Sequence, residues 1–393
     1  MKDFGVISRG LIMPLLQDGD NLVEIVSNKV IALHRKAAIT LQPRDVLAIT
    51  ESIVARSQGN YAKLSDISDW MYTKYKNQEI GICFPILSRN RFVNLLKGLT
   101  KHAKKVYLQL SFPADEVGNH FITEQQLFEK RVSTTDFYTE KEFRKLFPNI
   151  KHKFTGIDYI DLYKKAVGKK CEIILSNNPC ELLKYTKNIV AANIHDRFIT
   201  KAMILKQNKK AKVTLLSDIL TKSHKGSGFN KDYGILGSNF STDTKIKLFP
   251  RNCFDFCKQV QSKIYKATGI KIEVMVYGDG AFKDPVGKIW ELADPVVSPG
   301  YTSGLVGTPN ELKLKMYIDN AKNKKDKAKL LKEIQSNIKN KGKNLVGKNT
   351  SLGTTPRQLT DLLGSLSDLT SGSGDKGTPV ILIQNYFKNY TDK

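Results

Sequence analysis

The chain has 393 residues, and its 63 lysine and arginine residues against 38 aspartate and glutamate residues give a net charge of +25. A hydrophobic content of 40% and an aromatic content of 9% are ordinary for a folded protein that buries a sizeable core. This composition excludes a disordered chain, and no apolar run approaches the roughly 20 residues that a membrane-spanning helix needs.

The N-terminal region is predicted to form strands with one helix between them. Residues 22–30 (LVEIVSNKV) have helical spacing, and the preceding Asp18-Gly19-Asp20 supplies an N-cap. Residues 45–50 predict a short buried strand. Farther along, the patterns predict helices at 66–75, 89–105 and 253–268 and strands at 105–112, 171–175, 212–216 and 270–277. This alternation predicts α/β packing.

The stretches between these elements have distinct compositions. Residues 113–170 are polar and aromatic, and we expect an excursion with two short helices there. Residues 225–229 (KGSGF) predict a flexible loop. The lysine-rich stretch 320–348 predicts an amphipathic surface helix with basic flanks. The tail, 357–383, predicts a helix, a glycine loop and a strand.

The positive charge comes mainly from lysine, because 52 of the 63 basic residues are lysine and only 11 are arginine. Arginine is the residue favoured for reading bases and for gripping phosphates bidentately. The lysine excess is more typical of a solvated surface than of a nucleic-acid groove. Binding to nucleic acid is therefore the least favoured functional hypothesis.

The N-terminus and the cysteines indicate a cytoplasmic location. The first five residues carry an early acid and lead into no signal-peptide pattern. The five cysteines are Cys83, Cys171, Cys180, Cys253 and Cys257. Their odd number and wide spacing argue against a disulfide framework. Cys253 and Cys257 lie on one helix face, but no further Cys or His completes a zinc pattern around them.

The most informative segment is the glycine loop at 370–379 (TSGSGDKGTP), which follows a predicted helix and precedes a β-branched strand. Its glycines let the backbone approach a ligand closely, and its amides, hydroxyls and Lys376 suit a phosphate. It is not a Walker A loop, because no Gly-Lys-Ser/Thr opens a helix here. The alternative interpretation is a tight helix-to-strand turn.

Two other polar positions follow apolar segments. Asp279, between Gly278 and Gly280, comes after a predicted strand, where ligands collect in α/β sheets. Its carboxylate suits Mg²⁺ or Mn²⁺, but it could equally cap its own turn. Asn239 could contact a base or ribose, or hold a turn.

The triplet His195-Asp196-Arg197 permits an acid–base interpretation or a structural hydrogen-bonded pair.

Several segments together resemble a known family, the GTP-dependent γ-glutamyl ligases that add glutamate to the precursor of the deazaflavin coenzyme F-420. The matching segments are 12–20 (IMPLLQDGD), 50–59 (TESIVARSQG), 236–239 (LGSN), 274–280 (VMVYGDG) and 360–383. The resemblance covers residues 1–60, about 228–297 and 355–387, which is under half of the chain.

The resemblance implies an α/β (α+β) mixed-sheet fold of the γ-glutamyl-ligase type in a longer, bacterial-type relative. Residues 1–60, 228–300 and 350–393 would form the nucleotide-binding core. Residues 61–227 would be a central extension of uncertain role, and 301–349 a lysine-rich helical insertion. The family also implies GTP or ATP as co-substrate, Mg²⁺ or Mn²⁺, a small carboxylate or amino-acid substrate, and a homodimer.

The resemblance also implies site residues, position by position, but no catalytic residue. The implied nucleotide contacts are Met13, Pro14, Leu15, Leu16, Glu51, Ser52, Arg56, Asn239, Gly372, Ser373, Gly374, Asp375, Lys376, Gly377 and Thr378. Arg56 stands where the family has lysine and would act as an electrostatic clamp, with Lys376 and the loop amides on phosphate. Asp279 would hold the divalent metal.

Two matched positions depart from the family. Leu236 stands where the family has a metal-binding aspartate, and Ser373 where it has a metal-binding glutamate. Asp232, Asp284 or Asp375 could substitute. The leading hypothesis is a metal-assisted amide ligase, and the alternative is a nucleotide-binding protein that has lost ligase activity.

Overall fold

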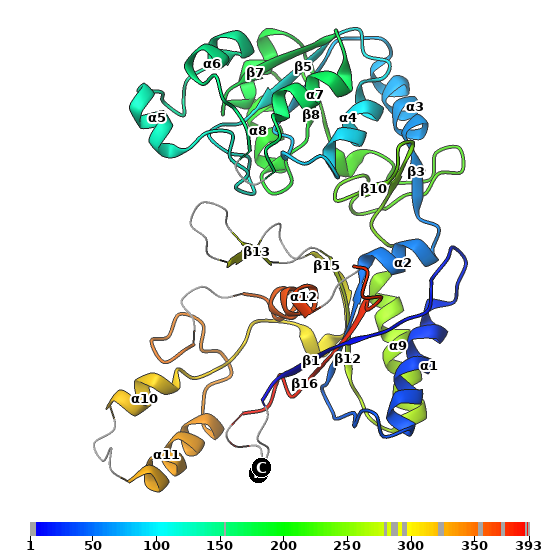
Figure 1. The fold of residues 1–393 in the computed structure, drawn as a ribbon, viewed down its shortest axis with the longest axis vertical. Helices are drawn as coiled ribbons and strands as arrows, with labels where there is room; N and C mark the ends of the chain where they lie inside the picture. Colours follow the sequence, from blue (N-terminus) through cyan, green and yellow to red (C-terminus); the bar gives the residue numbers. More distant parts are fainter. Residues whose placement is uncertain are drawn as a thin grey trace. The chain divides into compact units, whose positions relative to one another are not determined.

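The computed structural model describes residues 5–152, 155–278, 281–283, 290–292, 297–320, 326–352, 357–370, 374–389 and 391. The chain divides into two compact units. Unit 1 comprises Met1–Val54, Asn252–Lys283 and Trp290–Lys393, and unit 2 comprises Ala55–Arg251 and Asp284–Ile289. Helices and mixed sheets in both units (Figure 1) confirm the predicted α/β fold class. In these ranges, no helix is long and apolar enough to cross a membrane.

Unit 1 is built on a five-stranded sheet in the order β1-β16-β2-β12-β15. Its strands are β1 (Ile7–Leu11), β16 (Val380–Gln384), β2 (Val46–Thr50), β12 (Glu273–Gly278) and β15 (Val297–Tyr301). β2 and β12 run parallel, whereas the other neighbouring pairs run antiparallel. A separate two-stranded sheet pairs β13 (Ala281–Lys283) with β14 (Trp290–Leu292).

Helices cover both faces of the five-stranded sheet, as Figure 1 shows. α1 (Leu22–Arg35) and α9 (Cys253–Thr268) pack on the face that carries Leu47 and Ile49 of β2. α12 (Leu359–Thr370) packs on the opposite face, against Val46 and Ala48. Successive residues of β2 thus point to opposite cores, as strand geometry requires. α2 (Glu51–Ser57) follows β2, and the boundary between the units falls within it.

The helices predicted at 22–30 and 253–268 are confirmed. α9 spans the predicted residues and ends at Gly269, whose φ of +70° provides the left-handed C-cap that glycine adopts easily. α1 extends beyond the predicted 22–30, with Asn21 rather than the aspartates accepting the capping bond from the amide of Glu24. Cys253 and Cys257 are buried residues of α9 itself, and burial raises the pKa of the Cys253 thiol to about 12.

The lysine-rich region of unit 1 is helical but is not one helix. It contains η3 (Ser303–Leu305), α10 (Leu314–Asn320) and α11 (Lys327–Lys339). Ile334 and Ile338 of α11 pack with Leu312 and Leu345 in a small apolar cluster of their own. The predicted amphipathic character is therefore confirmed for α11.

Unit 2 contains a six-stranded sheet in the order β6-β7-β5-β4-β8-β9. Its strands are β4 (Ile80–Cys83), β5 (Val106–Leu110), β6 (Tyr138–Thr139), β7 (Cys171–Leu175), β8 (Asn188–Ala191) and β9 (Lys212–Leu215). All neighbours are parallel except β6 and β7. A second, three-stranded sheet joins β3 (Tyr61–Lys63), β11 (Lys245–Lys247) and β10 (Asn239–Thr242).

Helices also cover both faces of the six-stranded sheet. α3 (Leu64–Tyr75), α4 (Phe92–Thr100) and α7 (Tyr159–Val167) cover one face, and α8 (Arg197–Gln207) with η1 (Pro179–Lys184) covers the other. α5 (Glu124–Lys130), α6 (Glu140–Leu146) and η2 (Leu216–Asp218) complete the unit. The excursion 113–170 therefore holds three helices rather than the two predicted, and the helix predicted at 89–105 is shorter.

Two adjacent carboxylates tie together the strand ends of this sheet. Asp115 accepts hydrogen bonds from the amide of Leu87, after β4, at 2.7 Å and from that of Asn119 at 2.9 Å. Glu116 accepts one from the amide of His195, after β8, at 2.9 Å. Both carboxyl groups have raised pKa values because burial disfavours their charged forms. The loops after β4, β5 and β8 are thereby fixed at one edge.

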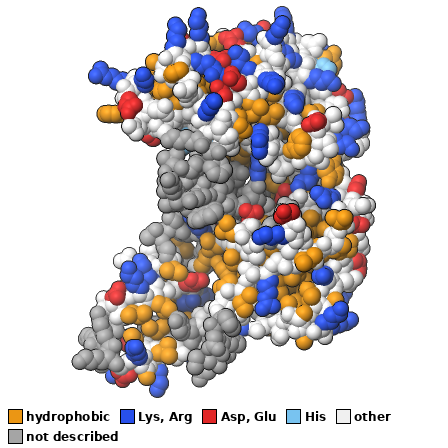
Figure 2. Space-filling view, in the orientation of Figure 1, with side chains coloured by type: hydrophobic (Ala, Val, Ile, Leu, Met, Phe, Trp, Pro, Cys, Tyr) orange, Lys and Arg blue, Asp and Glu red, His pale blue; other side chains and the backbone are white. Residues whose placement is uncertain are grey.

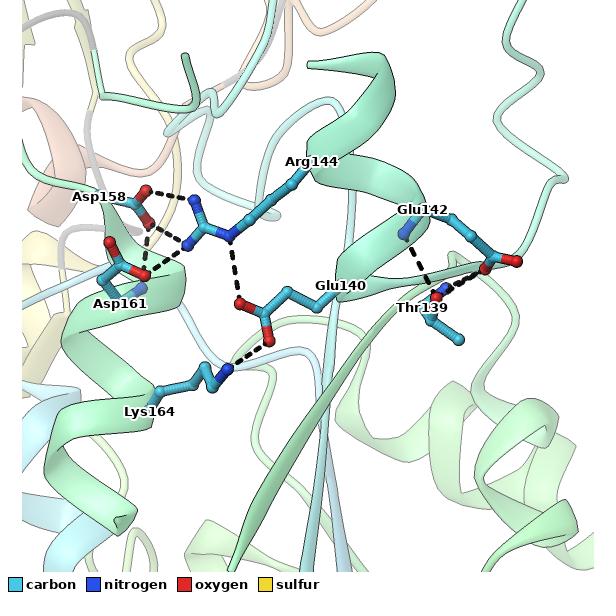
Figure 3. Close-up of polar contacts among 7 residues, drawn as sticks. All are labelled: Thr139, Glu140, Glu142, Arg144, Asp158, Asp161 and Lys164. Carbon is cyan, nitrogen blue, oxygen red and sulfur yellow. Dashed lines mark hydrogen bonds and ion pairs between the residues drawn. The ribbon is translucent and has the colours of Figure 1, made fainter. Parts of the chain in front are cut away.

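An ion-pair network joins α6 to α7 in unit 2, as Figure 3 shows. The Arg144 guanidinium lies 2.9 Å from Asp158 and 2.5 Å from Asp161, both near the start of α7. It also lies 3.1 Å from Glu140 of its own helix, and Glu140 in turn pairs with Lys164 at 2.7 Å. The Arg144 side chain is 27% exposed, so solvent screens this network only in part.

The substitution Arg144→Met should lower the free energy of unfolding by about 1–2 kcal/mol, because it leaves Asp158 and Glu140 without their common partner. Lys184→Met is the matched control, since Lys184 pairs with Glu181 but its side chain is 67% exposed. The control should cost less than about 0.5 kcal/mol. Urea denaturation of the two variants measures both values, and equal losses would contradict a structural role for the network.

Candidate functional site

Four segments that are far apart in the sequence meet at one edge of the unit 1 sheet. β2 and β12 both end there, because they are parallel with Thr50 opposite Tyr277. β16 begins there and β1 ends there, since Val380 lies opposite both Ile49 and Leu11. The chain following β1, β2 and β12 and the chain preceding β16 therefore share this edge, which we call the nucleotide edge after the role predicted for its segments.

Backbone hydrogen bonds fix the segments to one another. The amide of Met13 donates to the carbonyl of Gly377 at 3.0 Å, and the amide of Thr50 donates to that of Pro379 at 3.0 Å. Gly10 packs so closely that a Cβ there would lie 2.8 Å from Cβ of Thr378. The opening segment and the tail loop, both predicted from the sequence to contact a nucleotide, thus form one continuous rim.

Glu51 crosses the end of β12 at this edge. It is the first residue of α2 and only 6% exposed. A Cβ on Gly278 would lie 2.8 Å from Cγ of Glu51, so glycine is what allows the two to pack. Ser52 follows, half-buried. A carboxylate is therefore held beside the residue that directly precedes Asp279 in the sequence.

The described part of the glycine loop is a turn. The amide of Gly377, at φ +66°, donates to the carbonyl of Gly374 at 3.3 Å. Asp375 and Lys376 are exposed at its tip, and no residue in the described part of the chain accepts from their amides. Thr378 is buried. The interpretation as a tight turn therefore fits the described residues. The phosphate-binding interpretation stays a prediction, for which the exposed residues Asp375 and Lys376 are available.

The opening segment alternates between the core and solvent. Met13 and Leu16 are buried, whereas Pro14 and Leu15 are exposed, Leu15 by 95%. Burial of Met13 and Leu16 anchors the segment, and the exposed pair is what a ligand at the edge could contact.

Other predicted residues belong to unit 2. Arg56 is exposed, and Asn239 begins β10, where it pairs with Lys247. Leu236 is 5% exposed and packs in the main apolar cluster of that unit, so it contributes no ligand group. Asp232 is exposed. The structure therefore does not gather these residues within unit 1.

The remaining predicted residues, Asp279, Asp284, Gly372 and Ser373, lie outside the described residues. Within the described ranges, no three His, Cys, Asp or Glu side chains lie close enough together to hold a metal ion. The acidic groups at the nucleotide edge carry only oxygen donors, which fit Mg²⁺ or Mn²⁺ better than zinc.

The triplet His195-Asp196-Arg197 connects β8 to α8 in unit 2. The backbone amide of His195 donates to Glu116, and the guanidinium of Arg197 donates to the carbonyl of Ile194. These contacts are those of a helix entry. The acid–base interpretation of the triplet stays a prediction.

Tyr277, at the end of β12, was not identified from the sequence. It is 1% exposed, and its hydroxyl has no hydrogen-bond partner among the residues that the structure describes. Burial and the nearby Asp368 carboxylate of α12 raise the pKa of Tyr277. A tyrosine in a strand is an ordinary β-former, so the sequence held no signal that this hydroxyl would be left unpaired.

The substitution Tyr277→Phe should leave the free energy of unfolding unchanged or raise it by up to about 1 kcal/mol, because it removes a buried polar atom to which the described residues offer no hydrogen bond. Tyr163→Phe is the matched control. The Tyr163 hydroxyl is equally buried but donates to Ile86 at 2.6 Å and accepts from the Ser88 amide at 3.0 Å. The control should lose about 1–3 kcal/mol in urea denaturation. A similar loss in both variants would show that Tyr277 has a partner in solution.

Comparison with known proteins places this edge in a family context. The chain matches the family model described as F420-0:gamma-glutamyl ligase over residues 10–385. No curated protein matches the chain significantly. The family match runs through all four segments of the nucleotide edge and across nearly the whole chain, beyond the stretches in which the sequence alone shows resemblance. The protein therefore belongs to the F420-0:gamma-glutamyl ligase family.

Proposed function

We propose that this protein is a nucleotide-dependent, metal-assisted ligase that forms an amide bond on a small carboxylate substrate, with a γ-glutamyl ligase as the most specific form. The observation that carries the proposal is the nucleotide edge. Segments that were assigned to the nucleotide from sequence resemblance alone, at Met13, Glu51 and Gly377, lie side by side in space. No single segment requires the other two to lie beside it, so their proximity supports a shared ligand.

The proposed reaction has two steps. A carboxylate oxygen of the substrate attacks the γ-phosphorus of GTP or ATP, and the nucleoside diphosphate leaves, so that an acyl phosphate forms. The amine of the incoming amino acid then attacks the carbonyl carbon, phosphate leaves, and the amine loses a proton. Both steps build negative charge on phosphoryl oxygens, and positioned cations and amides lower the barrier by stabilising that charge.

The residues of the glycine loop supply that stabilisation in the proposal. Asp375 and Lys376 are exposed, so their backbone amides would donate to a phosphate, and the Lys376 ammonium would add a charge. Arg56 is assigned as a further clamp and Asn239 as a nucleotide contact. Glu51 and Asp279 are the groups that would hold Mg²⁺ or Mn²⁺, which supplies Lewis-acid stabilisation to the phosphates when bound. A cytoplasmic homodimer completes the proposal.

A second candidate is a nucleotide-binding protein that no longer ligates. The observation in its favour is Leu236, which replaces a metal-binding aspartate of the family and is buried in an apolar cluster. Nucleic-acid binding is less favoured, because lysine and arginine side chains are scattered over the face drawn in Figure 2 rather than gathered in one stripe.

Turnover separates the two candidates. Phosphate release with GTP or ATP, Mn²⁺ and a panel of amino acids should depend on one amino acid, with glutamate expected first, together with a carboxylate acceptor. Nucleotide binding without release under any of these conditions would favour the non-catalytic candidate. Affinity for an oligonucleotide that falls steeply with salt concentration would favour nucleic-acid binding.

The substitution Asp279→Asn should abolish Mn²⁺-dependent nucleotide binding, because it removes the charge of the assigned metal ligand. Isothermal titration calorimetry with and without Mn²⁺ measures the effect. Asp243→Asn is the matched control, since Asp243 is an exposed aspartate of unit 2 to which no ligand role is assigned. Unchanged Mn²⁺-dependent affinity in Asp279→Asn, or an equal loss in the control, would remove the assignment.

A further inference from the structure

A hollow of about 150 Å³ opens on unit 2 beside the sheet of β3, β10 and β11. Three lysines from three different segments line it, together with one carboxylate and two groups that carry a hydroxyl. The principal lining residues are Tyr61, Lys63, Asp66, Lys225, Ser227 and Lys245. All of them belong to unit 2, and none of them is among the residues assigned to the nucleotide.

Two of the lysines face each other across the sheet. Lys63 of β3 lies directly opposite Lys245 of β11 in the antiparallel register. Directly opposed residues have their Cβ atoms about 4.5–5.5 Å apart, and like charges in that arrangement destabilise the strand pair. Among the described residues, no carboxylate pairs with either lysine. Both side chains are exposed, so solvent screens this repulsion in part, but no ion pair among the described residues offsets it.

The third lysine is held at the hollow by a strained turn. Lys225 and Gly226 have φ values of +51° and +81°, and the Ser227 amide donates to the His224 carbonyl at 3.0 Å. A positive φ costs a lysine roughly 1–2 kcal/mol. The Lys225 ammonium lies 2.6 Å from Asp69 of α3, which fixes its position. The sequence predicted a flexible loop here, but the structure shows a hydrogen-bonded turn.

The turn is also fixed to β3. The amide of Gly228 donates to the carbonyl of Tyr61 at 2.7 Å, and a Cβ on Gly228 would lie 2.6 Å from that oxygen. The amide of Phe229 donates to the Asn60 side chain at 3.0 Å. The wall of the hollow is thus preorganised, so a ligand would not have to order it.

The acid in the lining does not neutralise the lysines. Asp66 accepts the backbone amide of Lys63 at 2.7 Å, as part of the cap of α3. Its charge is directed at the helix start, where the helix dipole is already positive. Lys63 and Lys245 therefore have no ion-pair partner in the part of the chain that the structure describes.

We propose that this hollow is a second ligand site, which binds a phosphate group carried by a small molecule. Lys63 and Lys245, for which the described residues supply no ion-pair partner, would bind a phosphate as point charges, and Lys225 would share its charge between the phosphate and Asp69. The hydroxyl of Ser227 adds a neutral donor. A bound dianion would attract both Lys63 and Lys245 and so offset the repulsion between them. The site shares no residue with the ligase site proposed above.

Calorimetric titration of the full chain with inorganic phosphate, at low ionic strength and with acetate as a parallel titrant, tests the proposal. The wild type should bind one phosphate saturably and acetate at least about tenfold more weakly, because acetate carries a single charge. The double variant Lys63→Gln/Lys245→Gln should bind phosphate at least about tenfold more weakly. Its thermal midpoint without phosphate should equal or exceed that of the wild type, because the repulsion is gone.

The matched control is Lys130→Gln/Lys209→Gln, which removes the same charge from exposed positions of unit 2 outside the hollow. The control should retain wild-type affinity for phosphate within about twofold. Equal weakening in both double variants, or no saturable phosphate binding by the wild type, would overturn the site. Acetate binding as tight as phosphate would overturn the phosphate assignment. Ligase turnover should be the same in all three proteins, so failure here is distinguishable from failure of the proposed function.

Discussion

The parallel pairing of β2 with β12 is the constraint on which unit 1 depends. Both strands are fully buried, and their register puts Thr50 beside Tyr277. Parallel strands have their carboxyl ends at the same edge, so Glu51 and Gly278 must be neighbours. An antiparallel pairing would place them at opposite edges. The antiparallel addition of β16 then brings the glycine loop to this edge, because the loop precedes that strand.

Elements with strong local signals were predictable from the sequence. α9 has apolar residues at helical spacing and a glycine at its C-cap, and its bounds were predicted correctly. β4 and β8 were missed. Each has four residues in a parallel sheet, and both are covered on both faces, so they show no alternation of polar and apolar residues. Short apolar runs of this kind gain their conformation from neighbouring strands rather than from their own sequence.

The candidate site was predictable in its segments but not in its assembly. Resemblance identified the chain around Met13, Glu51 and Gly377, but only the strand register determines that these segments touch. Tyr277 illustrates the opposite case. Its residue type fits a strand, and its hydroxyl lies in the core between β12 and α12 with no hydrogen-bond partner among the described residues. A property that arises from an absent contact leaves no pattern in the sequence.

The lysine residues also divide into those that the sequence explains and a few that only the structure distinguishes. Most lysines cost little where they are, because water solvates a long flexible side chain on an open surface. The pair Lys63 and Lys245 differs, since the register of β3 and β11 fixes both stems on one side of a sheet. The strained Lys225 lies at the same hollow. The repulsion between Lys63 and Lys245 arises from strand register, whereas the backbone strain at Lys225 arises from its turn. Their coincidence at one concave surface is better explained by a bound anion than by the average composition of the chain.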